Sequence, residues 1–180
     1  MERIRAVDNN TSTEKRKALL DNIQAELGMI PNFMRIMVNS PAALKAYLNF
    51  SAGLEGGSLS PRLREQIALM VSEFNDSGYC LAIHTAIGRM VGLSEEDVVD
   101  CRKGISSDGK EGAALLFAGK VLEKRGKISD EDISCLHRAG YSDGDITEII
   151  ANVALNIFTN YFNLAVGSEV DFPEVASIDK

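Results

Sequence analysis

Several residue types are scarce in this sequence, and each scarcity excludes a class of protein. The chain of 180 residues has no tryptophan, two histidines and three cysteines. The cysteines are Cys80, Cys101 and Cys135, and no pair of them has the spacing of metal ligands, so we expect free thiols and no metal site. Met1 is followed by charged residues rather than an apolar stretch, so we expect no secretory signal and a cytoplasmic protein.

Positive charge is also in deficit. The formal net charge is −7 at pH 7, and because phosphate binding needs a basic surface, we expect no nucleic-acid partner. No apolar run approaches the roughly 18 residues of a membrane span, so we expect no membrane partner either. The length fits one domain over residues 1–180, long enough to bury a substantial core.

Helix start and stop signals are abundant. Ser40-Pro41 and Ser60-Pro61 each place a capping residue before a proline at the first helical position, and Thr11 to Glu14 is typical of a capping box. We expect helices over about 14–27, 31–37, 41–54, 61–74, 80–91, from 94 onward, 112–125, 130–138 and 142–165. Sustained alternation of period two is missing, so the sequence predicts an all-α fold without a sheet.

A faint internal repeat runs through the second half. Gly92–Val98 matches Gly140–Ile146 at an offset of 48 residues, and Glu65–Leu69 resembles Glu111–Leu115 at an offset of 46. The similar offsets indicate two related helical hairpins. The alternative is that helix caps and apolar faces look alike by chance.

Cys80 and His84 are the best candidates for chemistry. Residues four apart on a helix lie on one face, about 5–6 Å apart at Cβ, so the imidazole can hydrogen-bond the thiol and take its proton. Cys80 follows Asn75 to Gly78 and should lie in the first turn of its helix, where the positive end of the helix also favours a thiolate, the nucleophilic form. The alternative is a small buried cysteine and a histidine that only fills the core.

Glu65 is the third member of this group. If its helix and the Cys80 helix form a hairpin, Glu65 comes closer to His84 than to Cys80 and can orient the imidazole or relay its proton. The alternative is an acidic residue placed at a helix start by the helix dipole alone. We expect Cys101 and Cys135 to be structural, and His137 to be a helix cap or surface group.

At these residues the chain resembles a known family. The segments Leu59–Leu69, Tyr79–Thr85 and Gly92–Ser94 resemble the carboxymuconolactone decarboxylase superfamily, and within it the alkyl hydroperoxidase D-like (AhpD-like), peroxidase-related branch. Further similarity lies at 27–32 and 40–44, and at 156–163 and 171–173 near the C-terminal end.

The resemblance implies an all-helical AhpD-like bundle, with its core over about 40–166 after an N-terminal helical extension, and a homo-oligomer, commonly a trimer or hexamer. In the peroxidase members a glutamate, a Cys-x-x-Cys pair and a histidine form a dithiol with a proton relay, and no cofactor is expected. The glutamate falls on Glu65, the attacking cysteine on Cys80 and the histidine on His84, with Tyr79 as a supporting neighbour. The first cysteine of the motif falls on Ser77, which cannot form a disulfide.

Three functions remain open from the sequence. The first is a peroxidase-related oxidoreductase that uses the Cys80 thiolate alone. Its oxidised sulfur would then be resolved by Cys101, Cys135, a neighbouring subunit, a small thiol or a redox partner protein. The second is a lyase for a small carboxylated lactone, in which Glu65 and His84 do acid–base work. The third is a non-catalytic redox sensor or oligomeric scaffold.

Overall fold

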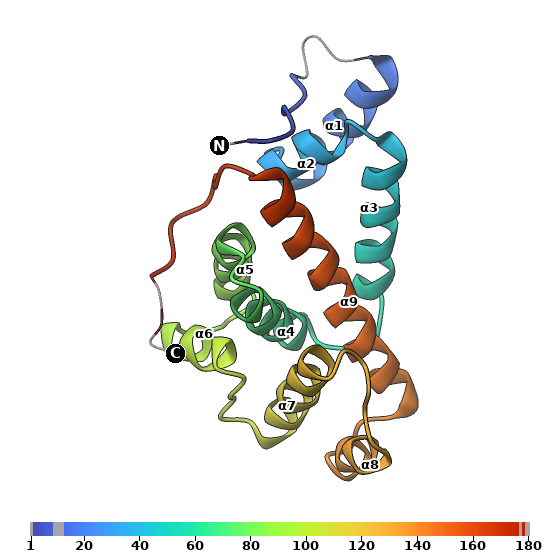
Figure 1. The fold of residues 1–180 in the computed structure, drawn as a ribbon, viewed down its shortest axis with the longest axis vertical. Helices are drawn as coiled ribbons and strands as arrows, with labels where there is room; N and C mark the ends of the chain where they lie inside the picture. Colours follow the sequence, from blue (N-terminus) through green and yellow to red (C-terminus); the bar gives the residue numbers. More distant parts are fainter. Residues whose placement is uncertain (1, 9–12, 177, 179–180) are drawn as a thin grey trace.

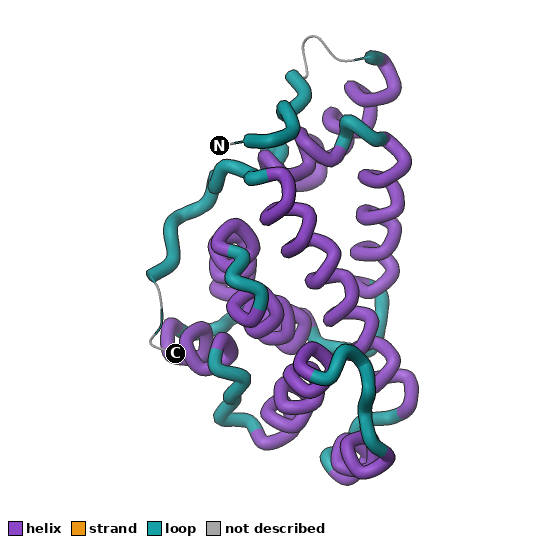
Figure 2. The backbone as a smooth tube through the Cα atoms, viewed as in Figure 1, coloured by secondary structure: helices purple, strands orange, loops and turns teal. Residues whose placement is uncertain are grey.

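The computed structural model describes residues 2–8, 13–176 and 178, and these residues form helices and no strand (Figures 1 and 2). The all-α prediction is therefore confirmed. In chain order the helices are α1 (Glu14–Leu27), α2 (Asn32–Met37), α3 (Pro41–Glu55), α4 (Pro61–Phe74), α5 (Gly78–Met90), α6 (Glu95–Arg102), α7 (Gly109–Glu123), α8 (Asp130–Arg138) and α9 (Asp143–Val166).

Most helix ends lie where the sequence signals place them. Ser40 and Ser60 cap α3 and α4 by accepting hydrogen bonds from the backbone amides of Ala43 and Leu63. Gly28 ends α1 with a φ of 73°, a left-handed conformation that glycine adopts without steric cost.

The first helix and two others differ from the prediction. Thr11 and Ser12 of the expected capping box lie outside the described residues, and Thr13, the N-cap of α1, makes no side-chain capping hydrogen bond. Helices α5 and α7 begin two and three residues earlier than expected, because Ser77 and Asp108 are their N-caps.

Helices α4 and α9 form the centre of the molecule. Helix α4 contacts α5, α6, α7 and α9, while α9 also packs against α3 and α5. Residues 66–72 of α4 are all buried, as expected for a helix covered on every side. By their spacing Leu63, Ile67, Met70, Val71 and Phe74 share one apolar face of this helix, yet Phe74 is 51% exposed at the helix end.

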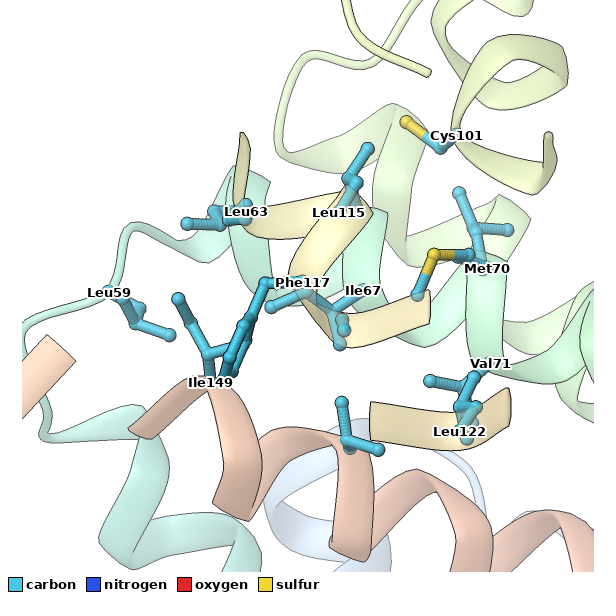
Figure 3. Close-up of a cluster of buried hydrophobic side chains, with 14 of the residues drawn as sticks. Leu59, Leu63, Ile67, Met70, Val71, Cys101, Leu115, Phe117, Leu122 and Ile149 are labelled. Atoms are coloured by element: carbon cyan, nitrogen blue, oxygen red, sulfur yellow. The ribbon is translucent and has the colours of Figure 1, made fainter. Parts of the chain in front are cut away.

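Two hydrophobic clusters divide the core. The larger one lies where α4 meets α6, α7, α8 and α9, and includes Leu115, Ile149 and Cys101 (Figure 3). The second is built mainly by α1, α2 and α3 and includes Cys80 and Tyr79 of α5. The N-terminal extension therefore supplies one wall around the candidate cysteine.

The repeat has a structural counterpart in the order of helices and caps. Ser94 before α6 and Ser142 before α9 both form complete capping boxes, with Asp97 and Asp145. Hydrogen bonds from the backbone amide and the hydroxyl of Ser94 are the main cause that lowers the pKa of Asp97. The bond from the Ser58 hydroxyl, then those from Ser142, lower the pKa of Asp145 to about 2.

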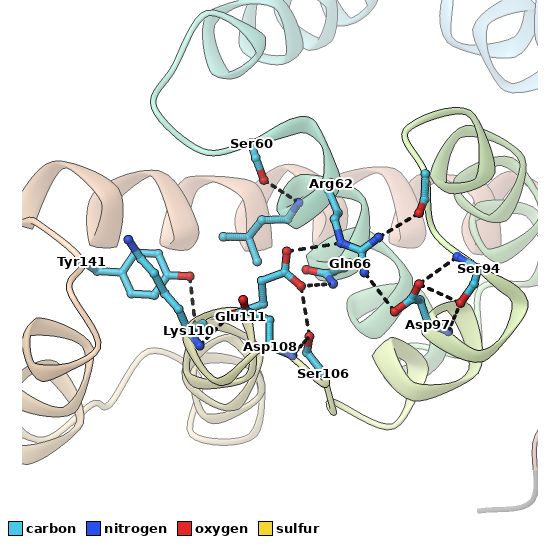
Figure 4. A network of polar contacts seen from close by, with 12 residues as sticks. Ser60, Arg62, Gln66, Ser94, Asp97, Ser106, Asp108, Lys110, Glu111 and Tyr141 are labelled. Atoms are coloured by element: carbon cyan, nitrogen blue, oxygen red, sulfur yellow. Dashed lines mark hydrogen bonds and ion pairs between the residues drawn. The ribbon is translucent and has the colours of Figure 1, made fainter.

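The repeated glutamates have different partners. Glu111, at the position that matches Glu65, contacts the side chains of Arg62, Gln66 and Ser106 (Figure 4). These bonds tie α4 to α7 and to the loop before it. The second copy of the pattern thus has a structural network where the first has the candidate site.

Helix α9 is, by length and composition, apolar enough to cross a membrane. Within its most apolar window, 44% of the residues are buried, and its inward face carries the buried asparagines Asn152, Asn156, Asn160 and Asn163. A central helix of a globular core passes the same test, so the finding does not assign a membrane location.

The larger cluster provides a test of the packing. Leu115 is fully buried and its neighbour Leu116 is 59% exposed. We expect Leu115→Ala to lower the free energy of unfolding by about 2–5 kcal/mol. The control Leu116→Ala should change it by no more than about 0.5 kcal/mol. Urea unfolding of both variants measures the difference, and equal effects would contradict this description of the core.

Candidate active site

Cys80 is the third residue of α5 and lies close to its N-terminus, as predicted. Its side chain is 1% exposed, and its sulfur accepts a hydrogen bond from Asn163 Nδ2 of α9 at 3.3 Å. The sulfur therefore has an N–H donor beside it and lies near the positive end of a helix, inside a buried site.

His84 and Glu65 form the second part of the site. His84 Nδ1 of α5 lies 2.8 Å from Glu65 Oε2 of α4, and the side chains are 19% and 15% exposed. An ionised carboxylate only accepts hydrogen bonds, so the contact places a proton on Nδ1 and leaves Nε2 as the basic nitrogen. Glu65 is thus closer to His84 than to Cys80, as the hairpin geometry indicated, and the structure adds the direct contact that the sequence left open.

The direct hydrogen bond between thiol and imidazole is not formed. Among the described residues the sulfur of Cys80 bonds Asn163, whereas His84 bonds Glu65. Helical spacing brings two residues to one face, but here tertiary partners on α9 and α4 draw the two side chains to different neighbours. A proton passing between them needs a bound molecule as a bridge.

Ser77 is buried beside this group, with 1% of its surface exposed. It is the N-cap of α5, yet its hydroxyl makes no capping bond and finds no hydrogen-bond partner among the described residues. A buried hydroxyl without a partner is energetically costly. The Ser77 hydroxyl is therefore an unpaired, enclosed group three residues before Cys80.

Tyr79 is fixed by the C-terminal segment. Its hydroxyl donates a 2.7 Å hydrogen bond to Asp171, and its ring packs edge-on against Phe33 and Phe172. Burial first, and then the Asp171 bond, raise the pKa of Tyr79 far above its ordinary value. It stays a neutral donor that holds the start of α5 in place.

A cavity of about 610 Å³ lies between α1–α3 on one side and α4, α5 and α9 on the other. Cys80, Glu65 and His84 all line it, together with Tyr47 of α3. Burial is the main cause that raises the pKa of Tyr47, so its phenol is neutral at physiological pH. The three predicted residues therefore share one chamber.

Sequence reasoning missed the residues that α9 contributes. Asn152, Asn156, Thr159 and Asn163 all line the cavity, and all are buried. The signal was present in the sequence, since asparagines recur at helical spacing inside a stripe of Ile, Val and Leu. A buried polar residue that interrupts an apolar stripe requires a partner, and here Asn163 finds it in the sulfur.

The other cysteines lie elsewhere. Cys101 belongs to the larger cluster, and burial raises its pKa to about 12 (Figure 3). Cys135 is exposed on α8, where its sulfur contacts Arg138 and Glu131. His137 is a surface group near a helix end, 2.9 Å from Asp143, as predicted. In the part of the chain that the structure describes, no His, Cys, Asp or Glu side chains group closely enough to hold a metal ion.

Solved structures and a family model are similar to this chain. The fold is that of the AhpD core: one similar structure is an uncharacterised peroxidase-related protein from Ralstonia eutropha JMP134 with an alkylhydroperoxidase AhpD core. It has a TM-score of 0.84 and 22% identity over 94% of this chain and 92% of that one. Residues 41–123, which run from α3 to α7, match the model of the carboxymuconolactone decarboxylase family.

Two further solved structures share the fold. A peroxidase-related protein from Silicibacter sp. TM1040 has a TM-score of 0.80 and 24% identity over 94% of both chains. The debrominase Bmp8, as a cysteine-to-alanine variant in complex with 2,3,4-tribromopyrrole, has a TM-score of 0.79 and 20% identity over 95% of this chain and 92% of its own. None of the curated proteins matches the sequence.

The contact between Asn163 and the sulfur can be tested directly. We expect Asn163→Leu to slow alkylation of Cys80 at pH 7 about tenfold or more, because a hydrogen bond to a charged group contributes about 1.5–3 kcal/mol. The rate is measured by iodoacetamide labelling and peptide mass spectrometry, which separates Cys80 from the other thiols.

Asn160→Leu is the matched control. Asn160 is equally buried on the same helix, but it bonds Ser72 and Asn75 instead of the sulfur. Its replacement causes a similar structural loss and should leave the labelling rate close to that of the unmodified protein. Equal slowing in both variants would show that packing, and not the donor at the sulfur, governs the thiol.

Proposed function

We propose that the protein is a peroxidase-related oxidoreductase that uses Cys80 as its single reacting thiol. The observation that carries the proposal is that, among the described residues, Cys80 is the cysteine that lines the cavity, in company with the hydrogen-bonded Glu65–His84 pair. The fold shared with peroxidase-related proteins supports it further.

The chemistry needs one proton acceptor and one proton donor. The imidazole of His84 accepts the thiol proton, through the bound substrate or a water molecule. The thiolate sulfur then attacks the terminal oxygen of a hydroperoxide, the O–O bond breaks, and the imidazolium returns the proton to the departing alkoxide. Sulfur is oxidised to a sulfenic acid, and the hydroperoxide is reduced to an alcohol. Glu65 holds the imidazole in place through the hydrogen bond to Nδ1.

Resolution of the sulfenic acid relies on a thiol from outside the chain. Ser77 occupies the place of the resolving cysteine, and neither Cys101 nor Cys135 lines the cavity. A small thiol or a redox partner protein attacks the sulfenic sulfur and releases water, and a second thiol then frees Cys80 as the thiolate. The unpartnered Ser77 hydroxyl is suited to donate a hydrogen bond to the sulfenate oxygen.

A second candidate is the lyase reaction on a small carboxylated lactone. The Glu65–His84 hydrogen bond on the cavity wall and the family match of residues 41–123 favour it. Turnover of such a lactone that survives Cys80→Ser and is lost in His84→Ala would support this reaction over the peroxidase. Because one relative of the same fold is a debrominase, a brominated pyrrole belongs in the substrate panel.

We also propose that the protein is a cytoplasmic homo-oligomer, a trimer or hexamer. Apolar side chains on the outward face of α9, namely Ile150, Phe158, Tyr161 and Leu164, are 41–58% exposed. Such a stripe is suited to contact between copies of the chain. Light scattering of the purified protein measures its mass, and a monomer at micromolar concentration would contradict the assembly.

The thiol mechanism predicts the behaviour of two variants. With an organic hydroperoxide and an added small thiol, Cys80→Ser should lose at least about 100-fold of the activity, since the nucleophile is absent. Ser77→Cys should restore a Cys-x-x-Cys pair, so that treatment with hydroperoxide gives an internal disulfide, seen by mass spectrometry as the loss of two hydrogens.

Cys135→Ser is the control, because this exposed thiol lies away from the cavity, and its activity should be unchanged. Undiminished hydroperoxide turnover by Cys80→Ser would rule out the proposed chemistry.

A further inference from the structure

Three polar residues of α9 each donate a hydrogen bond within their own helix. Asn152 Nδ2 donates to the carbonyl oxygen of Glu148 at 2.8 Å, and Asn156 Nδ2 donates to that of Asn152 at 2.9 Å. The Thr159 hydroxyl donates to the carbonyl oxygens of Leu155 and Asn156. Because backbone carbonyls only accept, these contacts also settle which atom of each side-chain amide is the nitrogen.

The side-chain oxygens of the two asparagines are unpaired acceptors that face the cavity, and each amide nitrogen keeps a second N–H beside its oxygen. Neither Asn152 Oδ1 nor Asn156 Oδ1 accepts a hydrogen bond from the described residues. Three side-chain atoms in the described residues are fully enclosed without a partner: Gln66 Oε1, Ser77 Oγ and Thr85 Oγ1. The two asparagine oxygens are not enclosed in this way, so part of their surface is exposed. Since both residues line the cavity, their oxygens are open to it.

Asn163 differs from the other three residues. Its nitrogen donates to the Cys80 sulfur, and its oxygen accepts from the hydroxyl of Ser168, so both ends are in use. Along α9 the cavity wall therefore offers acceptors on Asn152, Asn156 and Thr159. The next lining residue, Asn163, contacts the sulfur of Cys80.

The rest of the wall is mainly apolar, with three acidic side chains and one arginine. Phe33 and Tyr47 pack edge to face at 5.5 Å, with Leu48 and Ile83 nearby on the lining. Three carboxylates, those of Glu26, Glu55 and Glu65, also line the chamber. Arg64 Nη1 is held by the backbone carbonyl oxygens of Leu54, Glu55 and Leu59. The surroundings therefore disfavour an anionic ligand.

We propose that Asn152, Asn156 and Thr159 form a substrate subsite for an uncharged ring compound that carries an O–H or N–H donor. The donor satisfies acceptors that are otherwise left unpaired on the cavity wall, while the ring lies against the apolar side. The inference rests on the proposed function, because the bound compound is the one whose electrophilic group meets Cys80. It also opposes a carboxylated substrate, and so separates the peroxidase from the lactone reaction.

The test uses three probes of equal ring size: 2-naphthol, 2-methoxynaphthalene and 2-naphthoate. They are titrated calorimetrically into Cys80→Ser protein, in which the thiol chemistry is absent. We expect 2-naphthol to bind about threefold to tenfold more tightly than its methyl ether, as for one neutral hydrogen bond. The carboxylate should bind more weakly than both. Equal binding of 2-naphthol and its ether, tighter binding of the carboxylate, or no binding of 2-naphthol would overturn the proposal.

Substitutions on α9 locate the site. Asn156→Leu and Thr159→Val should each weaken 2-naphthol binding about threefold to tenfold and leave the ether unchanged. Thr147→Val is the matched control, because Thr147 makes the same bond to a carbonyl one turn earlier, that of Asp143, but is exposed away from the cavity. If Asn156→Leu does not fold, the nearly isosteric Thr159→Val gives the same measurement. Unchanged 2-naphthol binding in Thr159→Val would contradict the subsite.

The outcomes for subsite and activity are distinguishable. Binding is measured without Cys80. If the protein lacks peroxidase activity but binds 2-naphthol more tightly than the ether, the subsite is supported and the proposed function is contradicted. If it reduces hydroperoxides but binds 2-naphthol and the ether equally, the function is supported and the subsite is contradicted.

Discussion

The hydrogen bond from Asn163 to the sulfur of Cys80 links the two halves of the structure. Helix α9 contributes Ile149 and Val153 to the larger cluster, and Cys80 belongs to the cluster built by α1–α3. A polar side chain in such a place must be satisfied, and the sulfur is the atom that satisfies it. The requirement to pair a buried amide therefore fixes the orientation of the thiol and the position of α5 against α9.

The sequence was sufficient for features that depend on local chemistry. Serine caps, prolines at first helical positions and Gly28 act within a few residues, so the helix bounds agree closely with the prediction. The hairpin of α4 and α5 indicated that Glu65 is closer to His84 than to Cys80, but the contact itself came only from the structure. Tertiary contacts were out of reach, since no local pattern states that Asp171 holds Tyr79, or that α9 draws Cys80 away from His84. Phe74 shows the same limit. The spacing of apolar residues predicts which face of a helix is buried, but not at which residue the neighbouring helices stop covering that face.

The two copies of the repeat show how one scaffold holds different chemistry. Both copies keep the serine–aspartate capping box, which depends on backbone geometry alone. Glu111 is tied to Arg62, Gln66 and Ser106, and its charge is balanced by a fixed cation. Glu65 faces a cavity and an imidazole instead. An arginine does not give up its proton, whereas a histidine can, so only the first copy pairs its glutamate with a group able to transfer a proton.

The size of the cavity bears on what the site selects. A volume of about 610 Å³ is far larger than a simple peroxide requires, and falls in the range typical of small-molecule pockets. A reaction at one sulfur atom gains specificity only if the remainder of the substrate is recognised elsewhere in the chamber. On α9 the recognising atoms are unpaired carbonyl oxygens of two asparagines and the hydroxyl oxygen of Thr159, which lie one to three helical turns from Asn163. The same helix that orients the nucleophile therefore also holds the groups able to orient its substrate.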